Sequence, residues 1–270
     1  MTATRRAFSR RLAGLALALP LWLAGCASAP PAVDPAARAA LAPTGTLRVA
    51  LYPGSPSSLV VGRNGERAGV TYELGLLAGK RLAVPVQFVE LARAAEVFEA
   101  VKAGRADLTF TNASEARMRE ADFTPALVRV ESGYLVSAAS GIGEMARIDQ
   151  AGVRVGVAEG GSSHATLTRE LKQARVVPLK SLDAAAQMLK SGELQAFASN
   201  KAILYELGDQ VPGSAVLPGR WSFENISLAI PRGRPPAALE WTRSFAASLK
   251  GSPELQAMIS RAGLRGTATD

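Results

Sequence analysis

Apolar and polar positions along this chain follow two periods, that of a strand and that of a helix. Short apolar runs at 47–51, 84–91 and 106–111 are typical of buried strands. Between them, apolar residues recur at helical spacing over 70–82 and at i, i+3, i+4 and i+7 over 94–101, which predicts amphipathic helices. Alternation of strand and helix predicts an α/β fold with mostly parallel strands.

The same order of elements returns in the second half of the chain. Both halves have a strand, a serine pair, a helix that ends near glycine, and a strand that ends at asparagine. The matched segments are 47–51 and 153–157, Ser57-Ser58 and Ser162-Ser163, 94–104 and 182–192, and the strands ending at Asn112 and Asn200. We therefore predict two similar lobes, joined by strands near 128–137 and 216–230 that form a hinge around a cleft.

The N-terminus has the features of an export signal. Four arginines precede an apolar run at 12–25 that is too short for a membrane span. It ends in Leu23-Ala24-Gly25-Cys26, which resembles a bacterial lipobox. We expect residues 1–25 to be cleaved, Cys26 to be lipidated, and the protein to be periplasmic and membrane-anchored. A plain secretory signal, a twin-arginine route through Arg5-Arg6, and either the inner or the outer membrane stay open.

Composition and charge add further expectations. Cys26 is the only cysteine, so no disulfide can form within the chain. The Ala/Pro-rich segment 26–44 is expected to be an unfolded tether. The formal net charge of +8 becomes +4 once the four arginines of residues 1–25 are removed. The remaining basic residues are scattered, so we expect no nucleic-acid partner, whereas a weak positive field favours anionic solutes.

Three segments carry a resemblance to a known family. They are Gly69-Val70-Thr71-Tyr72-Glu73-Leu74, Ala100-Val101-Lys102-Ala103-Gly104-Arg105-Ala106-Asp107, and Ser114-Glu115-Ala116-Arg117 followed by Asp122-Phe123-Thr124. Their order resembles solute-binding family 3, the amino-acid-type receptors of ABC transporters with the type 2 periplasmic-binding fold. The resemblance implies a two-lobed α/β fold with two hinge crossings, lobe 1 at 45–133 and 219–270, and lobe 2 at 134–218. It also implies a monomer, an ABC permease as partner, and no metal or cofactor.

The resemblance places Arg117 on the carboxylate of the ligand. A guanidinium offers a rigid, bidentate fork to a carboxylate. Asn112 and Ser114 flank the same loop and are expected to donate to the same anion, unless Ser114 only caps a helix. Ser162 and Ser163 follow two glycines and open a helix, where an anion can bind, or they too serve only as caps.

Two positions depart from the family pattern. Family members that bind α-amino acids usually have aspartate where this chain has Asn200, so recognition of an ammonium is in doubt unless Glu159 substitutes. The family usually has a stacking aromatic where this chain has Ser57 and Ser58. A smaller or more polar ligand, or a pocket that uses Tyr52 or Tyr134, is expected instead.

These residues favour a non-catalytic receptor that binds a small carboxylate-bearing solute, either an amino acid or an organic acid. Two alternatives remain. The first is an enzyme like the cyclohexadienyl dehydratases, for which Glu159 is the only obvious acid in lobe 2. The second is a receptor that reports its ligand to a membrane sensor. No catalytic triad, phosphate loop or metal-ligand spacing supports another activity.

Overall fold

The computed structural model describes residues 2, 34–62 and 64–268, and residues 33–270 form one compact unit. The helices of this unit are α1 (Pro35–Leu41), α2 (Val70–Leu82), α3 (Ala94–Lys102), α4 (Glu115–Met118), α5 (Ser162–Glu170), α6 (Leu182–Lys190), α7 (Lys201–Gly208), α8 (Pro236–Leu249) and α9 (Pro253–Arg261). The strands are β1 (Leu47–Leu51), β2 (Val60–Val61), β3 (Arg67–Ala68), β4 (Val86–Glu90), β5 (Thr109–Asn112), β6 (Ala121–Phe123), β7 (Val128–Val136), β8 (Arg154–Ala158), β9 (Arg175–Leu179), β10 (Ala196–Asn200), β11 (Ala215–Val216) and β12 (Ser222–Pro231).

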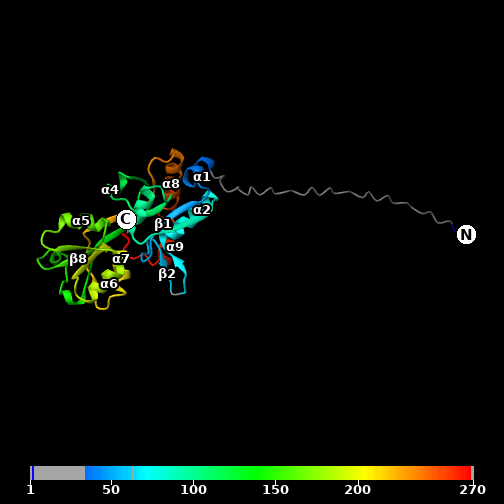
Figure 1. Ribbon diagram of the computed structural model, residues 1–270. Coiled ribbons are helices and arrows are strands. Elements are labelled where there is room, and N and C mark those ends of the chain that lie inside the picture. Colours follow the sequence, from blue (N-terminus) through cyan, green and yellow to red (C-terminus); the bar gives the residue numbers. More distant parts are fainter. Residues whose placement is uncertain (1, 3–33, 63, 269–270) are drawn as a thin grey trace. The chain divides into compact units, whose positions relative to one another are not determined.

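Lobe 1 contains the elements from both ends of the folded unit. Strand β1 pairs in parallel with β4, a single bridge links it to the segment before β5, and β5 pairs antiparallel with β12. In Figure 1, β1 and α2 lie on the same side of the unit as α8 and α9. These elements share one hydrophobic core, because their apolar stripes face the same sheet. Its fully buried members include Leu47, Leu74, Leu82 and Leu249.

Lobe 2 is built around β8, which lies between β10 and β9 in parallel register. Helices α5 and α6 connect these strands, as the sequence predicts for α/β units. Two hydrophobic clusters pack in this lobe: the first around Phe197 and Leu194, the second around Val155 and Leu167. In Figure 1, β8, α5 and α6 lie together on the side opposite α2 and α8.

Two long strands connect the lobes and form the predicted hinge. Strands β7 and β12 pair antiparallel through the register Ser222↔Ser132 to Ile226↔Val128. From this shared segment β12 continues beside β5 and β6, whereas β7 continues beside β10. One ladder order, β5-β12-β7-β10-β8-β9, therefore runs through both lobes. This confirms the two-lobed α/β fold with two crossings; the lobe boundaries given above remain a prediction.

The predicted tether ends earlier than expected. Asp34 caps α1, its carboxylate accepting a hydrogen bond from the Ala36 amide at 2.8 Å. Leu41 is buried against the core of lobe 1, and α1 packs on α8. The short Ala-rich segment thus folds because it has a cap, Pro35 in its first turn and an apolar partner helix. Residues 26–33, including Cys26, lie outside the described residues.

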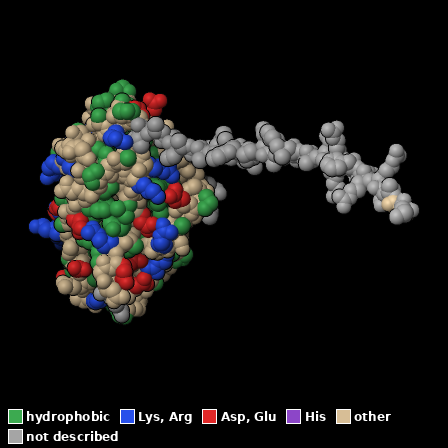
Figure 2. All heavy atoms as spheres, turned by 90° about the vertical axis from the view of Figure 1, so that its right-hand side faces the viewer, with side chains coloured by type: hydrophobic (Ala, Val, Ile, Leu, Met, Phe, Trp, Pro, Cys, Tyr) green, Lys and Arg blue, Asp and Glu red, His purple; other side chains and the backbone are tan. Residues whose placement is uncertain are grey.

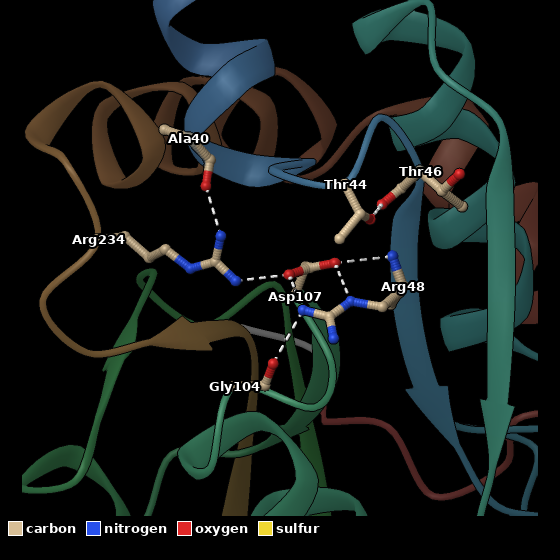
Figure 3. Close-up of polar contacts among 7 residues, drawn as sticks. All are labelled: Ala40, Thr44, Thr46, Arg48, Gly104, Asp107 and Arg234. Carbon is tan, nitrogen blue, oxygen red and sulfur yellow. Dashed lines mark hydrogen bonds and ion pairs between the residues drawn. The ribbon is translucent and has the colours of Figure 1, made fainter.

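A buried ion cluster fastens lobe 1 (Figure 3). The Asp107 carboxylate is fully buried and accepts hydrogen bonds from Arg48 Nε at 2.9 Å, from Arg48 Nη2 at 2.7 Å and from Arg234. Arg234 also donates to the Ala40 carbonyl at 2.7 Å, and Arg48 to the Gly104 carbonyl at 2.8 Å. The cluster therefore joins β1, α1, the loop before β5 and the loop after β12.

On the face shown in Figure 2, basic and acidic side chains are interspersed. Within the residues that the structure describes, no helix is both long enough and apolar enough to cross a membrane.

Candidate functional site

A cavity of about 70 Å³ lies between the two lobes, beside the hinge strands. The loops after β1 and β5 reach it from lobe 1, and the ends of β8 and β10 reach it from lobe 2, as expected for ligand sites in open α/β sheets. Its lining residues are Tyr52, Ser57, Ala94, Phe110, Thr111, Asn112, Arg117, Glu224 and Ile226 on one side, and Ala158, Gly161, Ser162, Ser163, Ala198, Ser199, Asn200 and Ile203 on the other.

Arg117 is held in this cavity by contacts on three sides. It belongs to the single-turn helix α4, whose cap Ser114 accepts a hydrogen bond from the Arg117 amide at 3.4 Å. The guanidinium donates through Nη1 to Thr111 Oγ1 at 2.9 Å. Its Cζ lies 4.9 Å from the centroid of the Phe98 ring, which stacks on Phe123. The side chain is therefore oriented before any ligand arrives.

The guanidinium of Arg117 forms no ion pair with a carboxylate of the described residues. Burial lowers the pKa of its guanidinium, and the more distant Glu224 and Tyr52 oppose this effect. Among the described residues, no carboxylate oxygen lies within the 4.0 Å of an ion pair with it. An arginine side chain nevertheless stays protonated in proteins. The cavity thus contains a desolvated cation that no carboxylate contacts, which favours binding of an anion.

Lobe 2 faces Arg117 with a helix N-terminus. Helix α5 begins at Ser162, and its N-cap is Gly161, which provides no side-chain hydrogen bond. Ser162 and Ser163 are thus not the caps of α5, and both line the cavity. The first turn of a helix carries partial positive charge and free amide donors, so this end favours an anion.

The lobes contact each other directly around the cavity. Asn112 Nδ2 donates to Ser162 Oγ at 3.0 Å, and Arg93 forms an ion pair with Glu159 at 2.6 Å. Both pairs join lobe 1 to lobe 2, so this is a closed arrangement of the cleft. Glu159 does not line the cavity, and its charge is compensated by Arg93. The structure thus offers no support for Glu159 as a substitute for the missing aspartate, because its carboxylate points elsewhere.

Asn200 lies in the cavity but both ends of its amide are in use. Its Oδ1 caps α7 by accepting from the Ile203 amide at 3.2 Å, and its Nδ2 donates to Glu224 Oε2 at 2.8 Å. Glu224, on β12, is a part-buried carboxylate that sequence reasoning missed. Burial raises the pKa of its carboxyl, while the hydrogen bond from Asn200 and the nearby Arg117 partly offset that effect.

Of the residues predicted for the site, the structure brings together Arg117, Asn112, Ser57, Ser162, Ser163 and Asn200. Three others lie outside the cavity lining. Ser58 is buried and accepts a hydrogen bond from the Tyr52 amide at 2.8 Å. Ser114 caps α4, and Tyr134 packs in the core of lobe 2 against Trp221. Of the two tyrosines considered, Tyr52 is the one that lines the cavity.

One signal in the sequence could have revealed Glu224. Ile226, Leu228 and Ile230 alternate along the predicted strand, and position 224 falls on the same face. A carboxylate on the apolar face of a hinge strand is costly unless it has a role. Thr111 and Phe98 carried no such signal, because their contacts with Arg117 depend on how α3 packs beside β5. The structure shows no cluster of metal-ligating side chains among the described residues.

Comparison with known proteins agrees with this fold. The L-cysteine solute receptor of Neisseria gonorrhoeae has 25% sequence identity and a TM-score of 0.74, covering 86% of this chain and 95% of that one. An amino acid ABC transporter substrate-binding protein of Streptococcus pneumoniae, solved with L-arginine, has 20% identity and a TM-score of 0.74, covering 83% and 96%. An ancestral amino acid-binding protein, described as a precursor of cyclohexadienyl dehydratase, has 20% identity and a TM-score of 0.71, covering 83% and 98%.

A search of curated proteins finds no match to this sequence. The family comparison is decisive. Residues 47–264 match the bacterial extracellular solute-binding proteins, family 3, and this match spans both lobes and the hinge. The chain is therefore a member of the bacterial extracellular solute-binding proteins of family 3.

Proposed function

We propose that this chain is the solute receptor of an ABC importer and binds a small carboxylate-bearing solute between its lobes. One observation carries the proposal: the part-buried, desolvated guanidinium of Arg117 lines the interlobe cavity without an ion-paired carboxylate among the described residues. A ligand carboxylate would compensate this charge and accept two parallel hydrogen bonds from it.

Closure of the cleft follows from the same geometry. Arg117 and Thr111 lie in lobe 1, and Ser162 and Ser163 lie in lobe 2. A carboxylate that contacts both sets stabilises the closed state more than the open one, and only such differential affinity can shift the equilibrium. The membrane part of the importer would recognise the closed form of the receptor. The receptors for L-cysteine and L-arginine among the structural relatives support this assignment.

The proposal includes export and a lipid anchor on Cys26, which lies outside the described residues. A test is growth of the producing bacterium with an alkyne-labelled fatty acid, followed by click detection on the purified protein. The wild-type chain is expected to be labelled and the Cys26→Ser variant unlabelled. Label on both variants, or on neither, would contradict the anchor.

Ligand binding is tested by thermal-shift screening. The mature chain, residues 26–270 with Cys26→Ser, would be screened against amino acids and small organic acids. A bound solute raises the melting temperature in proportion to the logarithm of its concentration over Kd. Arg117→Ala is expected to abolish the shift, and Arg119→Ala, an exposed arginine on the same loop, to leave it unchanged. Equal shifts in all three proteins would overturn the proposal.

The non-catalytic assignment is tested in the same series. A dehydratase needs an acid beside its substrate, and Glu224, not Glu159, is the acidic residue that lines the cavity. Incubation with prephenate or arogenate is expected to give no aromatic product above the rate in buffer. Product formation that disappears in Glu224→Gln would show that the chain is an enzyme.

A further inference from the structure

The interlobe cavity contains two opposite charges that do not neutralise each other. Arg117 and Glu224 both line it, and no oxygen of Glu224 lies within the 4.0 Å of an ion pair with Arg117. In a site of low dielectric, two such groups would gain most by direct contact. Their separation leaves one positive and one negative subsite in the same cavity.

The Glu224 carboxylate is held in place by a neutral donor. Asn200 Nδ2 donates to Oε2 at 2.8 Å, and Asn200 cannot turn its amide around, because Oδ1 caps α7. An aspartate at position 200 would place two carboxylates at hydrogen-bond distance, and the two could then not both be ionised at the same time without a large cost. The neutral Asn200 therefore allows Glu224 to carry the charge. Among the described residues, Asn200 provides the only side-chain hydrogen bond to this carboxylate.

The side chains around Glu224 indicate which kind of cation this negative subsite can bind. A metal ion needs several oxygen ligands, and no cluster of three potential ligands exists among the described residues. Lysine and arginine side chains of the described part of the protein form no ion pair with Glu224. An ammonium group from a ligand fits, because it needs one carboxylate and can donate further hydrogen bonds to neutral oxygens such as Ser199 or Tyr52.

We propose that Glu224 binds the ammonium group of the ligand, so that the solute is a zwitterionic α-amino acid rather than an organic acid. This inference rests on the proposed function, in which Arg117 binds the carboxylate. The negative charge comes from hinge strand β12, and lobe 2 contributes only neutral donors and a helix N-terminus. An organic acid would leave the part-buried Glu224 carboxylate without a cation in contact, and would therefore bind more weakly than an amino acid.

The test compares each amino acid with its desamino analogue. Titration calorimetry on the mature chain would use L-alanine with propanoate, L-leucine with 4-methylpentanoate, L-phenylalanine with 3-phenylpropanoate and L-glutamate with glutarate. We expect the best amino acid to bind at least about 100-fold more tightly than its analogue. Glu224→Gln is expected to reduce this ratio below about tenfold. Glu131→Gln, on the paired hinge strand but outside the cavity, is expected to leave the ratio unchanged.

The outcomes separate the inference from the function on which it rests. Analogues that bind as tightly as the amino acids, and need Arg117, would overturn the role of Glu224 and leave the receptor function intact. A panel in which no compound binds through Arg117 would overturn the receptor function itself. Glu224→Asp keeps the charge, so a retained ratio in this variant supports the inference even if Glu224→Gln does not fold; a lost ratio in a folded Glu224→Asp protein contradicts it.

A second observation concerns the side chain of the amino acid. A larger cavity of about 320 Å³ adjoins the first and shares Tyr52, Ala94, Ala158 and Ile203 with it. Further apolar walls come from Leu179, Leu182 and Phe197. Three charged residues also line this cavity: Arg93, which forms ion pairs with Glu96 and Glu159, and the exposed Lys180 and Asp183. We infer that this cavity accepts an apolar ligand side chain. The serines at 57 and 58, where the family usually has a stacking aromatic, predicted a smaller or more polar ligand or a pocket that uses a tyrosine. Tyr52 lines both cavities and offers an aromatic side chain there.

The same panel tests this second inference. L-Leucine, L-methionine and L-phenylalanine are expected to bind at least about tenfold more tightly than L-aspartate and L-lysine, because an apolar wall cannot compensate a charge. Leu182→Gln is expected to weaken leucine binding several-fold and to leave L-alanine, which does not reach the wall, unchanged. Tightest binding of a charged amino acid would overturn this inference without affecting that on Glu224.

Discussion

Two charged side chains of lobe 1, the buried Asp107 and the part-buried Arg117, differ in how the protein compensates their charge. Asp107 is surrounded by partners: the side chains of Arg48 and Arg234 and the backbone amide of Arg48 donate to its carboxylate (Figure 3). Arg117 has a hydroxyl and an aromatic ring beside it but no counter-ion among the described residues. The protein itself compensates the charge of Asp107, whereas the charge of Arg117 is left for a ligand to compensate.

This difference separates residues that stabilise the fold from residues that bind. A compensated buried charge contributes to stability only while all its partners remain. An uncompensated one reduces the stability of the unliganded protein and increases affinity for a complementary ligand. Substitutions at the two positions should therefore affect two different measurements, and the following predictions test that separation.

Among the substitutions considered, Asp107→Ala should have the largest effect, and this effect should be on the stability of the fold. It leaves Arg48 and Arg234 without their counter-charge, so we expect the free energy of unfolding to fall by about 3–5 kcal/mol. Arg117→Ala should change it by no more than about 1 kcal/mol, because the loss of two neutral hydrogen bonds and a ring contact is offset by the removal of a desolvated charge. Urea denaturation followed by circular dichroism measures both. An Arg117→Ala protein as unstable as Asp107→Ala would contradict the separation.

Arg117→Lys should weaken binding without affecting the fold. Lysine keeps the charge but not the planar fork that holds a carboxylate through two hydrogen bonds. We expect a loss of about 1.5–3 kcal/mol, roughly 10- to 150-fold in Kd, in calorimetric titration with the best amino acid of the screen. Arg119→Lys serves as the control. Unchanged affinity in Arg117→Lys would show that the carboxylate is not bound in a bidentate manner.

Acidification should weaken amino-acid binding through Glu224. The charged and titratable groups that act on it are Arg117, which stays protonated, and Tyr52, whose pKa is raised by burial. Because burial also raises the pKa of Glu224, protonation begins at a higher pH than for an exposed glutamate. Below that pKa the affinity should fall up to about tenfold per pH unit. Titrations from pH 7.5 to 4.5 check this, with Glu224→Gln expected to show no such dependence.

The stability of the unliganded protein should show the opposite trend for the same group. A carboxyl with a raised pKa in the folded state favours folding when it is protonated, and this contribution is lost as the pH rises through the folded-state pKa. Glu224→Gln should therefore be relatively more stable than wild type at neutral pH than at acid pH. A wild-type protein whose affinity for the amino acid does not change between pH 7.5 and pH 4.5 would contradict the role of Glu224 in binding.

Glu159→Gln should have the smallest effect. Its ion pair with Arg93 joins the lobes, but the Glu159 side chain is 42% exposed, so the pair is screened by solvent. We expect a loss of 0 to about 1 kcal/mol in closure, seen as a Kd increase of up to about fivefold for every ligand alike. Small-angle scattering measures the shift toward the open form. A change that depends on the ligand would indicate a direct contact instead.

Much of the fold could be predicted because its patterns are local. The run 47–51 became β1 without a change of boundary, and the helical spacing of 70–82 became α2. Helix α1 was missed because its stability comes from packing on α8, about 200 residues away in the sequence, rather than from its own pattern. The repeated serine pairs were also only partly equivalent. Ser162 opens α5, whereas Ser57 precedes hairpin β2–β3, which separates it from α2.

The site was less predictable because it depends on distant segments meeting. Arg117 and Asn112 could be placed from a resemblance, since they follow one strand. Glu224 could not be connected to Asn200, because the two lie on different elements and meet only once β12 and β10 both flank β7. Tyr134 lies on a strand that is buried on both faces. The alternation of residues along this strand therefore could not distinguish a side chain in the core from one in the cleft.

A crystal structure of the mature chain with the tightest-binding amino acid of the screen would show directly which protein groups hold the two charges of the ligand. We expect two oxygens of the ligand carboxylate about 3 Å from the guanidinium nitrogens of Arg117, in a closed cleft. We also expect the ligand nitrogen at a similar distance from the carboxylate of Glu224. A ligand carboxylate bound elsewhere, with Arg117 still lacking a counter-ion, would contradict this expectation.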